Sequence, residues 1–313
     1  MNKSVLLSRA CYVSCRGCST NAAKQTTPEH VSRQNKLYNE EANRQLQKVK
    51  RIEKIKVQHV GPNDRCTFVM NKKLSTPYHC AMHLNATYLS ATGLALVNGE
   101  PWHMHRPLLE DCDVKFLTFK DDDVEEINKA FWKGCGHLMG AILHTAFKDT
   151  IDIKAVHKPD LSVSTGCFAY DVSLPFHWRP TYDELLMLNR QAYRLIESRV
   201  PFERLEVPSE FAITLFEGNE YKTSEVEKKN TDNLTLYRLG KFIDLCDGPM
   251  VPNTQAMAIH RFSFTKTHLL NEDQDPEKDY IHRFQGIALP SAFETHYSTW
   301  TTIEDRARKP ITV

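Results

Sequence analysis

The sequence predicts an α+β protein, and two observations lead to that prediction. Between residues 55 and 120, short runs that alternate apolar and polar residues flank one helical segment. From residue 121 on, a long amphipathic segment is followed by strand-like runs that a further helix separates. Short strands mixed with helices in both parts of a chain are typical of the α+β class.

Residues 1–28 have the composition of a mitochondrial presequence. They hold four basic residues among serines, begin with a short apolar run, and contain no acidic residue. A secretory signal would need a longer apolar core, and no later stretch approaches the length of a membrane span. The cluster CYVSCRGC has the spacing of a metal site, but a cleaved leader holds no metal in a mature fold. We expect a soluble matrix protein.

Overall composition allows two ordinary domains and leaves the class of partner open. The chain has 313 residues with 41% hydrophobic content, which is enough for two cores. The 40 lysines and arginines nearly balance 39 aspartates and glutamates, so net charge alone does not indicate nucleic-acid binding. Nine cysteines are present, and those after the expected leader show no short pair spacing, which favours free thiols.

A basic helical arm is predicted over residues 29–56. Thr27 suits the N-cap and Pro28 the first helical position, and we expect the helix to end near Ile55. Because large apolar residues are few, we expect little contact with a core. A solvated charged helix and an arm that binds RNA phosphate explain the charge run equally well. The candidate RNA-binding residues are Arg33, Lys36, Arg44, Lys48, Lys50, Arg51, Lys54 and Lys56.

A small β-grasp domain is predicted over residues 57–120. The runs KIKVQH and CTFVMN alternate around the turn GPND, and STPYHCAMHLNATYLSA follows as a helix with Ser75 or Thr76 as its cap. LALVNGEPW and VKFLTF indicate two further strands. The histidine pairs at 79 and 83 and at 103 and 105 lack a nearby third ligand, so we favour structural roles for them.

A larger α+β domain is predicted over residues 121–285. Its first segment, 121–147, has acidic residues at the start and an apolar stripe, which together indicate a helix. VSTGCFAYDVSL, FAITLFEG and LTLYRLGKFIDLC indicate strands, and TYDELLMLNRQAYRLIES indicates a second helix. The polar segment 218–233 is interpreted as a helix and loop between two strands.

Several segments, in this order, resemble the N-terminal part of threonyl-tRNA synthetases. LVNGEPWHMHRPLLEDCDVKFLTF is similar to the end of the small N-terminal TGS domain of that family, and FWKGCGHLMGAIL is similar to its first editing-site helix. STGCFAYDVSL, FEGNEYK, FIDLCDGPMVPNT and HRFQGIALP resemble the segments that follow. The resemblance covers residues 57–290 and implies a TGS-like domain followed by an editing-like domain.

The resemblance also implies an editing pocket without its chemistry. In that family the pocket is built on a His-x-x-x-His helix and a Cys-x-x-x-His loop. The corresponding pairs here are Lys133 with His137 and Cys246 with Met250. Neither an ammonium group nor a thioether replaces imidazole as a proton acceptor or zinc ligand, so no catalytic residue, metal or cofactor is expected. The vestigial pocket comprises Lys133, His137, Lys222, Asp244, Cys246 and Met250, of which the lysine at 222 and the aspartate match the family.

Both synthetase-like domains with a damaged pocket resemble the family of mitochondrial large-subunit ribosomal protein thirty-nine. The resemblance implies a structural, non-catalytic component of the mitochondrial ribosome. Its expected partners are large-subunit rRNA and neighbouring ribosomal proteins, with no membrane and no small-molecule substrate. Only residues 291–313 follow the last segment, which leaves no room for the synthetase catalytic domain. For the tail at 286–313 we favour docking over packing back on the second domain.

Two other functions stay open on the sequence. A freestanding hydrolase that clears mischarged tRNA could use His137, Lys222, Asp244 and Cys246 as a reduced set, although loss of one acid–base group commonly costs about 100-fold or more. A binding module could hold tRNA or a nucleotide in the pocket without chemistry. No GxxxxGK[ST] phosphate-binding loop occurs in the sequence.

Overall fold

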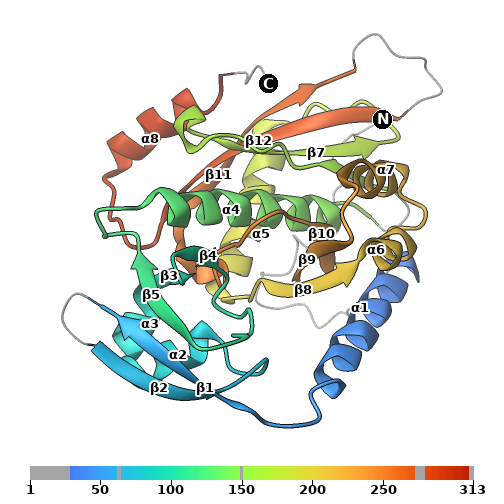
Figure 1. Cartoon of the computed structure of the whole chain (residues 1–313). Helices are drawn as coiled ribbons and strands as arrows, with labels where there is room; N and C mark the ends of the chain where they lie inside the picture. The colour runs from blue at the N-terminus through green and yellow to red at the C-terminus, as the bar shows by residue number, and fades with distance from the viewer. Residues whose placement is uncertain (1–28, 62–64, 149–150, 272–278, 310–313) are drawn as a thin grey trace, which may run out of the picture.

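The computed structural model describes residues 29–61, 65–148, 151–271 and 279–309, and within them the fold is α+β, as predicted. The expected presequence and its cysteine cluster lie outside the described residues, as does most of the turn GPND. Three sheets are present in the described ranges, with strand orders β2-β1-β5-β3-β4, β10-β9-β8 and β11-β12-β7-β6. Figure 1 shows helix α4 between the last two of these sheets.

The five-stranded sheet forms around the alternation seen in the sequence. In β1 every second residue is buried, and β1 pairs with β2 antiparallel and with β5 parallel. The single helix expected over 75–91 is two helices, because Asn85 adopts an extended backbone and ends the first of them. Thr76 is the N-cap, one of the two predicted. The elements are β1 (Lys54–Val60), β2 (Arg65–Asn71), α2 (Pro77–Leu84), α3 (Ala86–Ala91), β3 (Thr92–Val97), β4 (Glu100–Trp102) and β5 (Cys112–Thr118).

Helix α4 (Glu125–Ala146) is the predicted helix, and it supplies much of the main core. Gly140 lets both neighbouring sheets approach it closely. A Cβ at this position would lie 2.8 Å from a ring atom of Tyr170 and 2.9 Å from a ring atom of Phe242. The predicted helix before the three-stranded sheet is also present, as α5 (Tyr182–Glu197), and it begins with a capping box at Thr181.

The strand predictions for the second half were partly wrong. FAITLFEG overlaps helix α6 (Ser209–Leu215), and the buried residues Ala212, Leu215 and Phe216 follow helical spacing, which a short apolar run does not reveal clearly. LTLYRLGKFIDLC is a hairpin that turns at Gly240, where φ is +63°. The elements are β6 (Lys154–His157), β7 (Phe168–Leu174), β8 (Glu203–Pro208), α7 (Glu220–Lys229), β9 (Asn233–Leu239), β10 (Phe242–Leu245), β11 (Met257–Leu269) and β12 (Tyr280–Pro290).

The basic arm differs from its prediction in length and in contacts. Helix α1 (Glu29–Gln47) ends before residue 55, and Lys54 begins β1. The expected lack of core contact was also wrong, because Val31 and Tyr38 stand two turns apart on one face and are both buried. The Tyr38 hydroxyl donates to the carbonyl oxygen of Glu203 at 3.1 Å, and Arg238 lies over its ring. Figure 1 shows α1 beside the edge formed by α6 and β8.

The last described residues follow the alternative that we did not favour. Helix α8 (Tyr297–Arg306) packs against β11, and Trp300 is buried with Cys167 and Ile287. Thr265 Oγ1 donates to the carbonyl oxygen of Ala307 at 2.9 Å. The expected boundary at 286 falls inside β12. This segment therefore folds back on the four-stranded sheet, and a docking role for its outer face stays a prediction.

Two further findings concern the described ranges only. The helices found there are too short or too polar to cross a membrane. The cysteines there, at positions 66, 80, 112, 135, 167 and 246, are all free.

Candidate functional site

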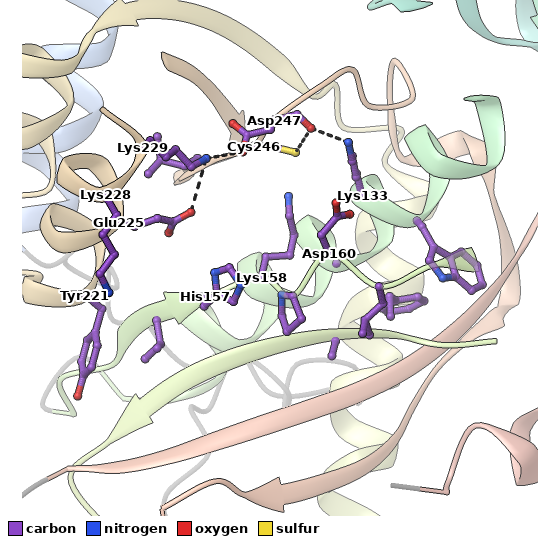
Figure 2. A pocket seen from close by; sticks show the side chains of 18 of the residues that line it. Lys133, His157, Lys158, Asp160, Tyr221, Glu225, Lys228, Lys229, Cys246 and Asp247 are labelled. Carbon is purple, nitrogen blue, oxygen red and sulfur yellow. Dashed lines mark hydrogen bonds and ion pairs between the residues drawn. The ribbon is translucent and has the colours of Figure 1, made fainter. Parts of the chain in front are cut away.

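A pocket of about 760 Å³ lies where α4, α7, the segment after β6 and the loop after β10 meet. Figure 2 shows Lys133 and Lys158 pointing toward the segment formed by Cys246 and Asp247. The six residues of the vestigial pocket lie at different depths, and two of them line this cavity. Lys133 and Cys246 line the cavity, whereas Lys222, Asp244 and His137 are almost completely buried. Met250 belongs to the hydrophobic core.

Lys222 and Asp244 form a buried ionic cluster with Glu225. The Lys222 Nζ atom lies 2.7 Å from Asp244 Oδ1 and 2.8 Å from Glu225 Oε2. Asp244 also accepts hydrogen bonds from the Tyr170 hydroxyl at 2.6 Å and from the Leu245 amide at 2.8 Å. These partners occupy both carboxylate oxygens of Asp244 and two donors of Lys222, so the pair holds α7 to β10.

The pKa values of this cluster keep both groups charged. Burial alone raises the pKa of Asp244, but the opposing charge of Lys222, followed by that of Lys158, brings it down to about 2. Burial alone lowers the pKa of Lys222, and the neighbouring Asp244 and Glu225 carboxylates more than offset it, so the pKa lies above its ordinary value. Neither group is therefore suited to exchange a proton near neutral pH.

Lys133 connects the α4 helix to the loop after β10. Its Nζ atom donates to the carbonyl oxygen of Asp247 at 2.6 Å, as Figure 2 shows. Gly248 leaves the space for this contact, because a Cβ there would lie 2.9 Å from the same nitrogen. The Cys246 thiol lies 3.8 Å from the same carbonyl oxygen. At the position where the resemblance implies a catalytic histidine, Lys133 instead links α4 to the loop after β10 by a hydrogen bond.

His137 is a core residue. Its ring is fully buried and packs against Phe202 and Phe242, at centroid distances of 5.9 and 5.1 Å. Neither ring nitrogen has a hydrogen-bond partner among the described residues. Burial first, and the charge of Lys158 second, lower its pKa to about 3. The imidazole is therefore neutral near pH 7.

Replacing His137 with Leu is expected to reduce the acid sensitivity of the fold. The histidine has a folded pKa of about 3 against an ordinary value of 6.5, so the unfolded chain takes up the proton first. Its contribution to stability is complete above about pH 6.5 and falls by about 1.4 kcal/mol per pH unit toward pH 3. Urea unfolding at about pH 7 and about pH 5 should show a smaller difference for His137→Leu than for the wild type. His157→Leu, which alters an exposed histidine, is the control, and equal pH dependence in all three proteins would contradict the assignment.

A second hollow, of about 950 Å³, lies between the end of α1, β8 and the five-stranded sheet. We call it the basic groove, because it is lined by eight cations and three carboxylates. Glu41 pairs with Arg44 at 2.6 Å, and Glu53 pairs with Lys72 at 3.3 Å. Arg106 lies 3.7 Å over the Trp102 ring. The cations of the groove are Arg44, Lys48, Lys50, Arg51, Lys72, Lys73, Arg106 and Arg204.

The predicted RNA-binding residues separate into two groups. Four of them line the basic groove, at positions 44, 48, 50 and 51. Arg33 pairs with Glu217, and Lys36 lies 3.9 Å from Glu40, both outside the groove. Lys54 and Lys56 stand exposed on β1. The groove cations at 72, 73, 106 and 204 were missed, because only the fold brings these separate segments to the arm.

The histidine pairs have ordinary structural partners. His79 Nδ1 accepts from the Thr76 amide at 3.1 Å, and His83 stacks on Phe68. His103 is buried against Tyr237. In the described part of the chain, no three His, Cys, Asp or Glu side chains come together as a metal site.

Comparison with known proteins agrees with the resemblance seen in the sequence. No family model matches the chain. The chain is 34% identical to the large ribosomal subunit protein mL39 of Drosophila melanogaster over 285 residues, which is 90% of this chain and 84% of the relative. It is 30% identical to a probable cytoplasmic threonine–tRNA ligase 1 of Dictyostelium discoideum, and 31% to threonine–tRNA ligase 2 of Bos taurus. These matches cover 84% and 75% of this chain but 36% and 30% of the ligases, so the chain spans about a third of their length. With this identity over most of both proteins, the chain belongs to the family of the large ribosomal subunit protein mL39.

Proposed function

We propose that the protein is a structural, non-catalytic component of the large subunit of the mitochondrial ribosome, where it binds large-subunit rRNA and neighbouring proteins. The observation that carries the proposal is the 34% identity to mL39 over 90% of the chain. Membership of this family also supports the expected location in the mitochondrial matrix. The ribosome would supply the surfaces that α1, the basic groove and α8 contact.

The architecture we propose follows the synthetase resemblance. The five-stranded sheet corresponds to a TGS-like β-grasp domain over residues 57–120, and α4 with the other two sheets to an editing-like domain over 121–285. The other two parts of the proposed domain division are the basic arm at 29–56 and the tail at 286–313. Similarity to threonine–tRNA ligases over 84% and 75% of the chain supports this assignment.

The chemistry of the pocket supports a role without catalysis. Hydrolysis of an ester needs a general base within hydrogen-bond reach of a water, and donors that stabilise the oxyanion. Asp244 and Lys222 are engaged with each other, and His137 packs between aromatic rings. Lys133 is bound to the Asp247 carbonyl. These four groups thus have a structural contact or a core position in place of a substrate-facing one, and of the reduced hydrolase set only Cys246 lines the cavity.

Charge in the basic groove supports RNA binding. Lys48, Lys50, Arg51 and Lys73 are exposed there, and no ion pair in the described ranges involves them. Such cations are free to replace counterions on RNA phosphates. Phosphate contacts of this kind position a protein on RNA and carry no sequence information.

Sedimentation of a mitochondrial lysate tests the proposal. The full-length chain with a small C-terminal tag should migrate with the large subunit on a sucrose gradient, both in whole ribosomes and after low magnesium separates the two subunits. Digestion of the rRNA with ribonuclease should shift it to lighter fractions. If the chain stayed in the light fractions while intact large subunits sedimented normally, the proposal would be wrong.

A further inference from the structure

Lys158 places an unpaired ammonium group in the pocket. It follows β6, and its Nζ atom is shielded from solvent without a hydrogen-bond partner among the described residues. Gly136 on α4 makes room for the stem of this side chain, because a Cβ at that glycine would lie 3.1 Å from Lys158 Cδ. In Figure 2 the side chain points toward the segment formed by Cys246 and Asp247. The fold thus directs a cation inward, and the described residues supply no acceptor for it.

Nearby carboxylates are already engaged with other lysines. Lys222 forms ion pairs with Asp244 and Glu225, and Lys229 forms one with Asp247 at 2.6 Å. Together with Lys133 and Lys158, these groups comprise four ammonium groups and three carboxylates, which leaves one positive charge in excess. At the rim, Asp160 and Lys228 are both exposed and opposite in charge. An anion bound at the inner end of the pocket would neutralise this excess positive charge.

A second donor in the pocket also lacks an acceptor. The indole Nε1 of Trp132 is buried and has no hydrogen-bond partner within the described ranges. Lys133 uses one of its donors on a neutral carbonyl oxygen, which leaves its charge uncompensated. Buried donors without acceptors are uncommon in native proteins, and two among the residues that line one cavity indicate a missing acceptor-rich partner. Phe168 and Leu161 add apolar surface to the same cavity.

We propose that this pocket binds a small organic oxyanion, with its phosphate or carboxylate at Lys158 and Lys133 and its apolar body against Trp132 and Phe168. The volume of about 760 Å³ lies within the range of small-ligand pockets, roughly 300–1,000 Å³. Ammonium groups suit both kinds of oxyanion, because they act as point charges. The proposal concerns binding alone, without a reaction of the ligand. This inference is independent of the ribosomal role.

Binding by the purified full-length chain tests the inference. Calorimetric titration would use three probes: inorganic phosphate, adenosine monophosphate and 3-phenylpropionate. We expect at least one of the two organic probes to bind, and the one that binds more tightly to identify the preferred oxyanion. Lys158→Met should weaken that binding by at least about tenfold. Lys115→Met, which removes an exposed lysine of β5, should bind like the wild type.

Thermal unfolding separates this site from other anion sites. Without a probe, Lys158→Met should unfold at a temperature close to that of the wild type, because it removes a shielded ammonium group without a hydrogen-bond partner but also removes its attraction to Asp244. With the probe, the increase in unfolding temperature should be lost in Lys158→Met and kept in Lys115→Met. If neither organic probe bound the wild type, or if Lys158→Met bound it equally well, the proposal would be overturned. Equal binding by the two proteins would show that the probe binds at another site, for example in the basic groove.

Discussion

Replacing Lys222 with Met is expected to destabilise the protein by about 3–5 kcal/mol. The Lys222 ammonium is the buried partner of both Asp244 and Glu225, at 2.7 and 2.8 Å. Asp244 is fully buried, so removal of the cation leaves an uncompensated charge, or a carboxylate that must take up a proton. Methionine keeps most of the side-chain volume, which limits any cavity. Urea unfolding near neutral pH measures the change.

The matched control lies on the same helix. Lys228 is exposed on α7, and Lys228→Met should change the free energy of unfolding by less than about 0.5 kcal/mol. Combining Lys222→Met with Asp244→Asn should recover part of the loss, because the second change removes the stranded charge. If Lys222→Met cost no more than the control, the buried cluster would not be the link between α7 and β10 described here.

Acid conditions give an independent measure of the same cluster. The folded pKa of Asp244 is about 2, below its ordinary value of 3.8, so its ionised form favours the folded state. This contribution is complete above about pH 4 and is lost as the pH falls through about 2. Both Asp244 and His137 make the folded state less stable as the pH falls, and the contribution of His137 begins to fall at a higher pH. His144 and His282, whose burial lowers their pKa values to about 4, also contribute to the loss of stability between about pH 6 and pH 4. The difference between the wild type and His137→Leu therefore isolates His137, and the difference between the wild type and Asp244→Asn isolates Asp244.

The sequence predicted those elements whose signals extend over several turns or alternations. Helix α4 has a long apolar stripe, and α5 begins with a capping box at Thr181, so both could be recognised. The short run FAITLFEG could not be assigned correctly, because a run of this length fits a strand or a buried helix. The early end of α1 was missed for a related reason. The basic composition continues through Lys54 and Lys56, although the backbone has already become a strand.

Residues of the candidate site could be predicted from the sequence only where the resemblance to the synthetases identified their positions. The six vestigial residues came from the synthetase pattern, and the structure brings five of them to or beneath one pocket. Lys158 and Trp132 carried no signal. Lys158 lies in a segment with no periodic pattern, and its importance depends on Gly136 leaving room for its stem. Charge balance within a cavity is a property of the folded chain, since the cations concerned come from three separate segments.

Loss of three cations in the basic groove should weaken RNA binding by about 100-fold near physiological salt. Lys48, Lys50 and Arg51 follow α1, line the groove and are exposed. If each contacts one phosphate, the triple change to Ala removes three counterion-releasing contacts. The slope of log affinity against log salt should then decrease in magnitude by about 2–3. Filter binding of the full-length chain to a large-subunit rRNA fragment, over a series of salt concentrations, measures both quantities.

A control with equal charge loss separates the groove from general attraction. Lys115, Lys120 and Lys266 are exposed and lie outside the groove, so their joint change to Ala also removes three charges. Specific contacts in the groove predict that this control keeps most of its affinity and nearly the whole salt slope, because distant charges are screened beyond about 8–10 Å. Equal losses in both variants would show that net charge, and not the groove, attracts the RNA. Both variants should unfold at the wild-type temperature, since the six lysine and arginine side chains are all exposed.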